Sequence, residues 1–402
     1  MPDTATTCAT SPVDLFAEEV LTDPFPVYSD LREKGAVVWL STLGFHAVTR
    51  YDEVREALRD WRTFSSASGV ALNPLANIAG AGTTLASDNP VHAARRKVVA
   101  RPLAPGLMRA LDERLTAEAN TIVDQLVTRG RFDAVRDLAW HLPLTVVSHF
   151  AGLPESGREQ MLEWSVSLPN AAGPDYPAAD DAYKARKAKG LSVVSAMQAY
   201  IQTNATREVL APGSWGAMLY DAADRGEIPV ESVPAMMRDY LGPSLDTTIS
   251  AIGSMIALLI ENPDQWQRLH EDRSLISSAV LEVVRMESPI QWLSRVLTHD
   301  HVIDGVELEA GTRVMLLYGS ANRDDRKFPD AASFDVGRDA VDHLGWGHGV
   351  HACIGNHLAR LEMAAILRAL LDRVERLEFT EPPQRLLNTT FRGYKHIPVR
   401  VC

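Results

Sequence analysis

Hydrophobic residues recur at every third or fourth position along most of this chain, which is the pattern of amphipathic helices. It predicts helices over residues 51–60, 109–127, 231–261, 274–287 and 354–375. The apolar stripe is clearest in two of them, which carry Ile249, Ile252, Ile256 and Leu259, and Met363, Leu367, Leu370 and Val374.

Strand patterns are short and confined to two regions of the chain. "AVVWL" and "FHAVT" lie near the start, and "RVLTHDHVIDGVELEAGTRVMLL" covers residues 295–317. We find no internal repeat and no Gly/Ser linker. We therefore expect one domain over residues 1–402, mainly α with small marginal β-sheets, in which residues 1–20 form a flexible N-terminal segment.

Composition and charge narrow the functional classes. Hydrophobic residues at 46% and charged residues at 23% are ordinary for a globular protein. A net charge of -12 argues against nucleic acid or an anionic membrane as a partner. The N-terminus lacks the pattern of a secretory signal, and the longest apolar run, residues 249–260, is too short to span a bilayer. We expect a cytoplasmic monomer.

The stretch "WGHGVHACIG", residues 346–355, contains Cys353. The helical pattern begins just after this residue, so its sulfur is expected at a helix N-terminus, where unpaired N–H groups favour the thiolate. Gly347 and Gly349 permit a tight turn, and Gly355 leaves room for a flat ligand. These features suit a haem iron bound through one sulfur.

Two other roles are open to Cys353. An isolated cysteine is usually a small buried apolar residue. A zinc site needs three or four ligands, and His348 and His351 with one cysteine do not form a recognised set. Cys8 and Cys402 lie at the two ends of the chain, so no disulfide framework is indicated.

The stretch resembles the haem-binding signature of the cytochrome P450 family, F-G-x-G-x-[HR]-x-C-x-G followed by L-A-R. The matching positions are Gly347, Gly349, His351, Cys353, Gly355, Leu358, Ala359 and Arg360. Trp346 stands where the family usually has phenylalanine. The resemblance implies the P450 fold, haem b as cofactor and Cys353 as the iron ligand, with Trp346, Gly347 and Gly355 beside the haem.

A second motif lies in "LEVVRMESP", where Glu282 and Arg285 are three positions apart on one helical face. Together with "FPDAASFDVGR", it resembles the family's buried Glu-Arg-Arg cluster, with Arg338 as the third member. The implied role is structural, since the cluster fixes the loop that carries the cysteine.

The two haem propionates need cationic partners. "DNPVHAARRKVV" resembles the family's D-x-P-x-H-x-x-x-R segment and places His92 and Arg96 on one helical face. Arg295 and His351 occupy the other positions at which relatives hold propionates.

A third motif, "YLGPSLDTTISAIG", lies in the most apolar predicted helix. Asp246 and Thr247 match the family's acid and alcohol pair, which relays protons to dioxygen bound at the iron. Pro243 and Ser244 replace the usual Ala-Gly. Proline removes one helical hydrogen bond and frees the carbonyl of Asp239.

The segments "TFSSASGVAL", "SLDTT", "ESPIQWLSR", "GSANRD" and "NTTFRG" resemble the P450 subgroup that oxidises para-substituted benzoates, often removing an O-methyl group. There, an arginine and a serine help to hold the substrate carboxylate. Ser68 and Asp239 align with these positions, which should disfavour a carboxylate. We therefore expect a neutral aromatic such as a para-substituted methoxyphenol, for example an alkyl-guaiacol-like phenol. A shifted alignment, or a charge supplied by Arg238, is the alternative.

The predicted substrate pocket follows from the resemblance and from apolar character. It comprises Val70, Leu72, Leu75, Ile78, Leu168, Asp239, Ser244, Trp292, Leu293 and Phe391.

The chain carries no flavin or iron-sulfur motif, so the resemblance implies electrons from NAD(P)H through ferredoxin reductase and ferredoxin. Basic residues near Cys353, with Arg96, Arg101 and His348 as candidates, would form the docking face. The alternatives are a monooxygenase of a terpenoid or macrolide, a peroxygenase, and a non-enzymatic haem sensor or carrier.

Overall fold

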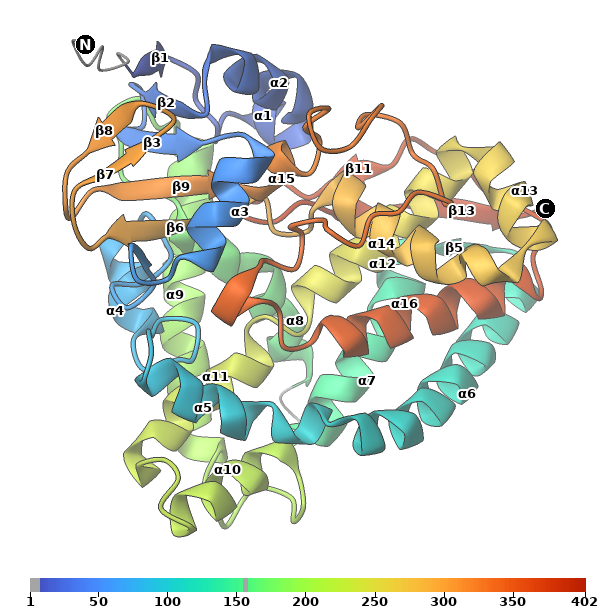
Figure 1. Cartoon of the computed structure of the whole chain (residues 1–402). Helices are drawn as coiled ribbons and strands as arrows, with labels where there is room; N and C mark the ends of the chain where they lie inside the picture. The colour runs from blue at the N-terminus through green and yellow to red at the C-terminus, as the bar shows by residue number, and fades with distance from the viewer. Residues whose placement is uncertain (1–7, 155–157) are drawn as a thin grey trace.

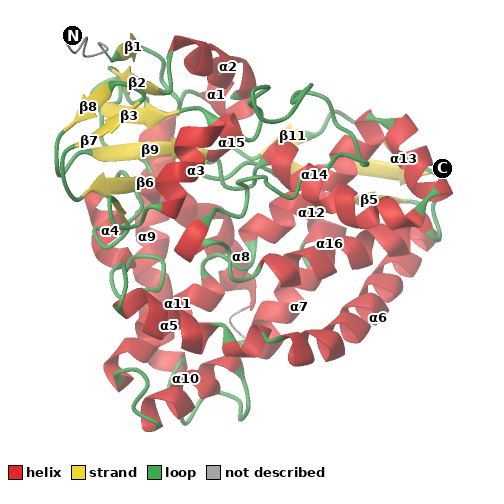
Figure 2. Cartoon of the chain, in the orientation of Figure 1, coloured by secondary structure: helices red, strands yellow, loops and turns green. Residues whose placement is uncertain are grey.

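Helices form most of the chain, and the sheets lie at its margins (Figures 1 and 2). The computed structural model describes residues 8–154 and 158–402. The longer helices are α2 (Phe25–Lys34), α3 (Tyr51–Arg59), α4 (Pro74–Gly80), α5 (Val91–Val99), α6 (Pro105–Arg129), α7 (His141–Phe150), α8 (Arg158–Ser167), α9 (Asp181–Asn204), α10 (Trp215–Asp224), α11 (Val233–Leu241), α12 (Asp246–Glu261), α13 (Pro263–Glu271), α14 (Ile276–Glu287) and α16 (Asn356–Leu371). This architecture confirms the predicted mainly α fold.

One mixed sheet gathers strands from both ends of the chain. Its order is β1 (Ala9–Ser11), β2 (Val37–Leu40), β3 (Phe45–Val48), β9 (Arg313–Leu317), β6 (Trp292–Leu297) and β4 (Phe64–Ser65). The smaller sheets pair β10 (Leu377–Phe379), β13 (Pro398–Val401) and β5 (Arg131–Asp133), β11 (Gln384–Arg385) with β12 (Tyr394–His396), and β7 (His301–Ile303) with β8 (Val306–Leu308).

The N-terminal segment differs from the expectation of flexibility over residues 1–20. Residues 1–7 lie outside the described part of the chain, but β1 pairs in parallel with β2. Phe16 is 1% exposed, and its ring packs edge-on against Trp292 at 5.9 Å between centroids. The apolar side chains after β1 therefore anchor this segment in a hydrophobic cluster.

The predicted helix over residues 231–261 is wrong as a single element, because α11 ends at Leu241 and α12 begins at Asp246. Pro243 lies in the gap, where its missing N–H leaves a helical hydrogen bond unmade. The break matters for function because it lies directly on a large internal cavity.

Helix α12 runs through the middle of the helical body and is buried on all sides; Ile252, Ser254 and Ala257 are 0% exposed. It packs against α14 and α16. Taken as one stretch, Val230–Glu261 is long and apolar enough to cross a membrane, but 78% of its apolar window is buried inside the fold, as in a core helix.

Candidate active site

An internal cavity lies where four parts of the chain meet. Its walls come from α5, the α11–α12 break, β6 and the segment from Gly345 to the start of α16. In Figure 1, the orange-red segment before α16 lies beside α3. The cavity brings together residues that are more than 300 positions apart in the sequence, from Leu58 to Met363.

The segment around Cys353 is held by backbone hydrogen bonds. The Cys353 amide donates to the carbonyl of Trp346 at 2.7 Å, and the Asn356 side chain donates to the Cys353 carbonyl at 2.6 Å. A Cβ added to Gly355 would stand 4.0 Å from the Cys353 sulfur. The sulfur therefore faces the cavity at the N-terminus of α16, as its sequence position predicts.

Burial raises the pKa of the Cys353 thiol, and the amide N–H groups of Gly355 and Asn356, with Arg96, lower it only in part. A cation bound at the sulfur would supply the missing stabilisation of the thiolate, since a coordinating thiol loses its proton. Within residues 8–154 and 158–402, no group of three or more His, Cys, Asp or Glu side chains is placed to hold a metal ion. A metal ion at this site would therefore have the Cys353 sulfur as its single protein ligand.

Two glycines give the segment its shape. Gly347 and Gly349 both have φ of 67°, a conformation that favours glycine. A Cβ on Gly349 would stand 2.6 Å from the carbonyl oxygen of Leu58, whereas one on Gly347 would meet nothing closer than 3.5 Å. Gly349 thus lets the segment pack directly on the end of α3.

Four cationic or proton-donating side chains converge on the cavity: His92, Arg96, Arg295 and His351. The His92 and His351 rings lie 4.3 Å apart between centroids. Arg96 donates to the Ala352 carbonyl at 2.6 Å and Arg295 to the Ser294 carbonyl at 2.8 Å, so their guanidinium groups are bound by neutral oxygens. The structure therefore brings the four predicted propionate partners together.

Among the described residues, no acidic side chain forms an ion pair with any of these four. Both ring nitrogens of His92 and the Nε2 atom of His351 are buried without a hydrogen-bond partner. Burial lowers the pKa of His351 to about 3, helped by Arg295, His92 and Arg96. Orphaned donors beside two arginines form a site for carboxylates, and the two propionates of a haem fit this requirement beside a single cysteine sulfur.

Asp246 and Thr247 lie at the α11–α12 break. They were expected in a helix centre, but Asp246 is the first residue of α12. Thr247 lines the cavity and donates to the Pro243 carbonyl at 2.8 Å. Asp246 is 5% exposed, and its Oδ2 atom has no hydrogen-bond partner. Burial raises its pKa to about 8, although Ser165 lowers it, so this carboxyl holds a proton at neutral pH.

Asp239, on the last turn of α11, also lines the cavity. It accepts hydrogen bonds from the Thr84 amide at 3.0 Å and from the Thr84 hydroxyl at 2.6 Å. Burial raises the pKa of Asp239 to about 6, while the Thr84 hydrogen bonds, Arg238 and Arg95 lower it. Its carboxylate is therefore largely ionised at neutral pH.

Arg238 does not supply a cation to the cavity. Its guanidinium donates to the carbonyl oxygens of Ala79 and Ala81, outside the cavity wall. Ser68 is exposed, and its carbonyl accepts a hydrogen bond from Arg313 at 2.9 Å. The alternative in which Arg238 binds a substrate carboxylate is therefore not supported by this geometry.

Three of the residues predicted for the substrate pocket, Asp239, Ser244 and Leu293, line the cavity. Leu75 and Ile78 instead lie on the outer face of α4, 61% and 72% exposed. Leu72 and Trp292 belong to a hydrophobic cluster beneath the sheet. The remaining three are also outside the cavity wall, and these are Val70, Leu168 and Phe391.

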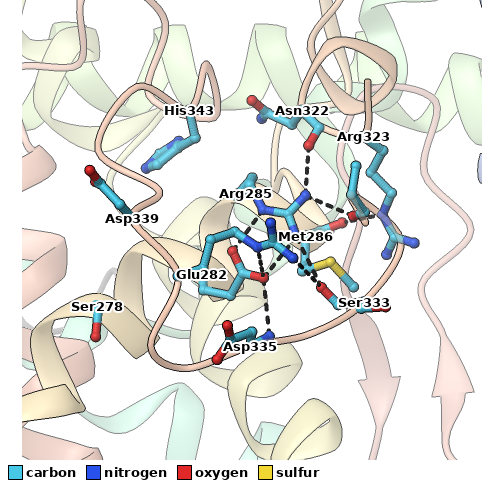
Figure 3. Close-up of polar contacts among 12 residues, drawn as sticks. Ser278, Glu282, Arg285, Met286, Asn322, Arg323, Ser333, Asp335, Asp339 and His343 are labelled. Atoms are coloured by element: carbon cyan, nitrogen blue, oxygen red, sulfur yellow. Dashed lines mark hydrogen bonds and ion pairs between the residues drawn. The ribbon is translucent and has the colours of Figure 1, made fainter. Parts of the chain in front are cut away.

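The predicted Glu-Arg-Arg cluster is present (Figure 3). Arg285 donates to Glu282 through two hydrogen bonds of 2.7 Å, and Arg338 donates to the same carboxylate at 3.0 Å. Arg285 also donates to the Asn322 carbonyl at 2.8 Å, and the Asn322 side chain accepts from the Leu344 amide at 2.6 Å. The cluster is thus connected to the segment that leads to Cys353.

Sequence reasoning missed several polar residues of the cavity wall, among them Thr84, Thr248 and Glu362. Glu362 is 2% exposed, its Oε1 atom has no hydrogen-bond partner, and burial raises its pKa to about 8. Its position on the apolar stripe of α16 was a usable signal, because an acid on a buried helical face is rare.

Comparison with known proteins agrees with this site. Residues 217–392 match the family model described as Cytochrome P450. The chain is 36% identical to cytochrome P450 CYP199A2 of Rhodopseudomonas palustris, over 97% of this chain and 93% of the relative. It is 31% identical to the cytochrome P450 monooxygenase PikC of Streptomyces venezuelae, over 98% and 95%.

The fold also matches a solved structure. Cytochrome P450 CREJ in complex with (4-ethylphenyl) dihydrogen phosphate superposes with a TM-score of 0.83 at 27% identity, covering 95% of this chain and 98% of that one. The relatives are matched along nearly their whole length, and the chain belongs to the cytochrome P450 family of haem-containing monooxygenases.

Proposed function

We propose that this monooxygenase holds haem b through Cys353 and oxidises a small neutral para-substituted aromatic, such as a methoxyphenol, by O-demethylation or hydroxylation. The single observation that carries the substrate assignment is the Asp239 carboxylate in the cavity wall, with Arg238 turned away from it. A substrate carboxylate would meet an anion there.

The haem would be bound as follows. Cys353 would supply the thiolate ligand of the iron, and His92, Arg96, Arg295 and His351 would bind the two propionates. Trp346, Gly347 and Gly355 would contact the haem, and Trp346 packs against His343 at 4.8 Å between ring centroids. When bound, haem supplies the activation of dioxygen and the transfer of one oxygen atom to the substrate.

The two residues to which we assign proton transfer, Asp246 and Thr247, lie at the α11–α12 break. Asp246 holds a proton at neutral pH, and the next residue, Thr247, lines the cavity. We assign to this pair the transfer of protons from the protein interior to the cavity. The broken helix exposes the Pro243 carbonyl, which orients the Thr247 hydroxyl.

Several features support an aromatic substrate. The segments quoted above resemble those of the subgroup that oxidises para-substituted benzoates, and CREJ binds a para-substituted phenyl compound. The cavity wall near α11 is mainly apolar, with Leu85 and Leu293 beside Asp239, Ser244 and Thr248. Such a wall suits a flat ligand with one polar end.

Electrons would come from NAD(P)H through ferredoxin reductase and ferredoxin. Of the three candidate docking residues, Arg96 faces the cavity and Arg101 pairs with Glu227. His348 remains, with Arg55 and Arg59 of α3 close enough to lower its pKa. We propose this basic group as the docking face of a cytoplasmic, monomeric, single-domain enzyme.

The test is reconstitution with haem, a ferredoxin, its reductase and NADH. Formaldehyde release from 4-methoxyphenol is expected, and the Cys353→His variant should lose the red-shifted carbonyl band of the reduced protein. Tight binding of 4-methoxybenzoate with rapid formaldehyde release would contradict the substrate assignment. Turnover with peroxide alone would favour a peroxygenase, and absence of product with every electron donor would favour a haem carrier.

A further inference from the structure

Two adjacent residues of α11 hold the same loop in different ways. The loop is residues 81–87, which lie between α4 and α5, and Ala79 lies just before it at the end of α4. Arg238 donates to the carbonyls of Ala79 and Ala81, and Asp239 accepts from the amide and hydroxyl of Thr84. Thr84 is 8% exposed and, like Asp239, lines the cavity.

The Asp239 carboxylate retains capacity to accept a further hydrogen bond. A carboxylate offers about four lone-pair sites, and both Thr84 donors together use only part of them. The Thr84 hydroxyl is directed at Oδ2, and its amide lies 3.1 Å from Oδ1 and 3.0 Å from Oδ2. Since Asp239 also faces the cavity, a ligand there could donate to the same carboxylate.

The charge around Asp239 favours a neutral donor over a cation. Arg238 on α11 and Arg95 on α5 both lower the pKa of Asp239, so two guanidinium groups already lie within electrostatic range. Arg95 is held by the Thr83 carbonyl at 3.3 Å, outside the cavity wall. An ammonium group would add a third positive charge beside them, whereas a hydroxyl would not.

We propose that Asp239 accepts a hydrogen bond from the hydroxyl of a phenolic substrate and that Thr84 is the positioning residue that fixes the carboxylate for it. This inference rests on the proposed function and names its substrate class more closely: aromatics with a free phenolic hydroxyl rather than fully methylated ethers, carboxylates or amines. The Asp239 carboxylate would then accept hydrogen bonds both from Thr84 of the loop and from the hydroxyl of the ligand.

The experiment compares the binding of matched ligands to the ferric holoenzyme by optical titration. 4-Methoxyphenol and 1,4-dimethoxybenzene differ by one methyl group and share their ring and their oxygens. The wild type is expected to bind the phenol at least about tenfold more tightly, because a hydrogen bond to a charged group is worth about that ratio.

Three variants separate the roles. In Asp239→Asn, both Thr84 donors occupy the amide oxygen and the amide N–H₂ faces the cavity, so the preference for the phenol should vanish or reverse. Thr84→Val should lower the preference at least about threefold, and Thr84→Ser should restore it. Thr83→Val is the matched control: the Thr83 hydroxyl bonds to the Gly80 carbonyl and the Ala86 amide but not to Asp239, so this variant should leave the preference unchanged.

Each outcome of the binding titrations either supports or overturns the proposal. Equal wild-type affinity for phenol and ether, or an unchanged preference in Asp239→Asn, would overturn this inference while leaving a neutral aromatic substrate intact. Tighter binding of 4-methoxybenzylamine than of 4-methoxyphenol would overturn the phenol assignment. Binding of 4-methoxybenzoate alone would contradict the proposed function itself.

Discussion

Arg285 and Glu282 form an ion pair that water does not reach: two hydrogen bonds of 2.7 Å join them, and both side chains are 0% exposed. The remaining acceptor capacity of Glu282 is used by Arg338 and by the Asp335 amide at 3.2 Å. A buried pair is tolerated only when its charges are matched and its other polar atoms are satisfied, and this one meets both conditions.

Glu282→Gln should destabilise the holoenzyme strongly, because it leaves two guanidinium groups without a negative partner in the interior. Removing one partner of a buried pair costs about 3–5 kcal/mol. Urea unfolding measures the loss. Asp224→Asn is the control, since it breaks the exposed pair with Arg207, and its midpoint should hardly change.

Gly349→Ala should weaken haem retention and stability more than Gly347→Ala. Both glycines have φ of 67°, so both alanines carry the same backbone strain, about 1–2 kcal/mol. Only the Gly349 methyl group would collide with the Leu58 carbonyl, which adds about 1–3 kcal/mol of overpacking. Thermal unfolding and the haem content of the two purified variants test the difference. Equal losses would mean that packing on α3 does not hold the loop.

Asp246→Asn should lower product formation at least about tenfold while leaving substrate affinity unchanged, since it removes a proton donor outside the cavity wall. Asp246 is protonated below its pKa of about 8, so wild-type product formation should fall as the pH rises through about 8. The variant should lack this step. A pH profile of product formed per NADH consumed provides the measurement, and a retained step would assign the proton to another group.

Glu362→Gln should flatten the dependence of stability on pH. Burial raises the pKa of Glu362 from 4.5 to about 8 in the folded protein. The folded state then binds the proton that the unfolded state has lost, so the contribution of Glu362 to stability should decrease as the pH rises from 5 to 8, by about 1.4 kcal/mol per pH unit, and the variant should lack this contribution. The exposed Glu381→Gln serves as control and should keep the wild-type slope.

Exclusion of carboxylates should weaken in acid. The Asp239 carboxylate loses its charge as the pH falls through about 6, against the opposing influence of Arg238 and Arg95. Binding of 4-methoxybenzoate should therefore be tighter at pH 5 than at pH 7.5 in the wild type, and independent of pH in Asp239→Asn. Optical titrations at the two pH values decide this, and pH-independent exclusion in the wild type would point to shape rather than charge.

Much of the helical fold could be predicted from hydrophobic spacing. The predictions over 51–60 and 109–127 match α3 and most of α6, because a period near 3.6 directly reports one buried face. The break in 231–261 could not be located in this way, since the apolar pattern continues across it. Pro243 was the signal, but only the structure shows that the chain leaves the helix there.

The substrate pocket was harder to predict for a geometric reason. Trp292 and Leu293 are neighbours on β6, so their side chains point to opposite faces of the sheet, and only Leu293 meets the cavity. Apolar character alone also cannot distinguish a pocket from a surface, as Leu75 and Ile78 demonstrate. The members of the propionate cluster could be predicted because each lies in a recognisable sequence motif. Their proximity in space could not, because it depends on the fold.

Arg238 and Asp239 carry opposite charges and both form hydrogen bonds to the same loop. This arrangement constrains how the enzyme could evolve. A substitution at Asp239 would alter which ligands are accepted and would also remove the hydrogen bonds that hold Thr84. Ligand preference and the position of the loop would then change together. A lineage that adopts a new substrate here would need a compensating change that holds the loop in place.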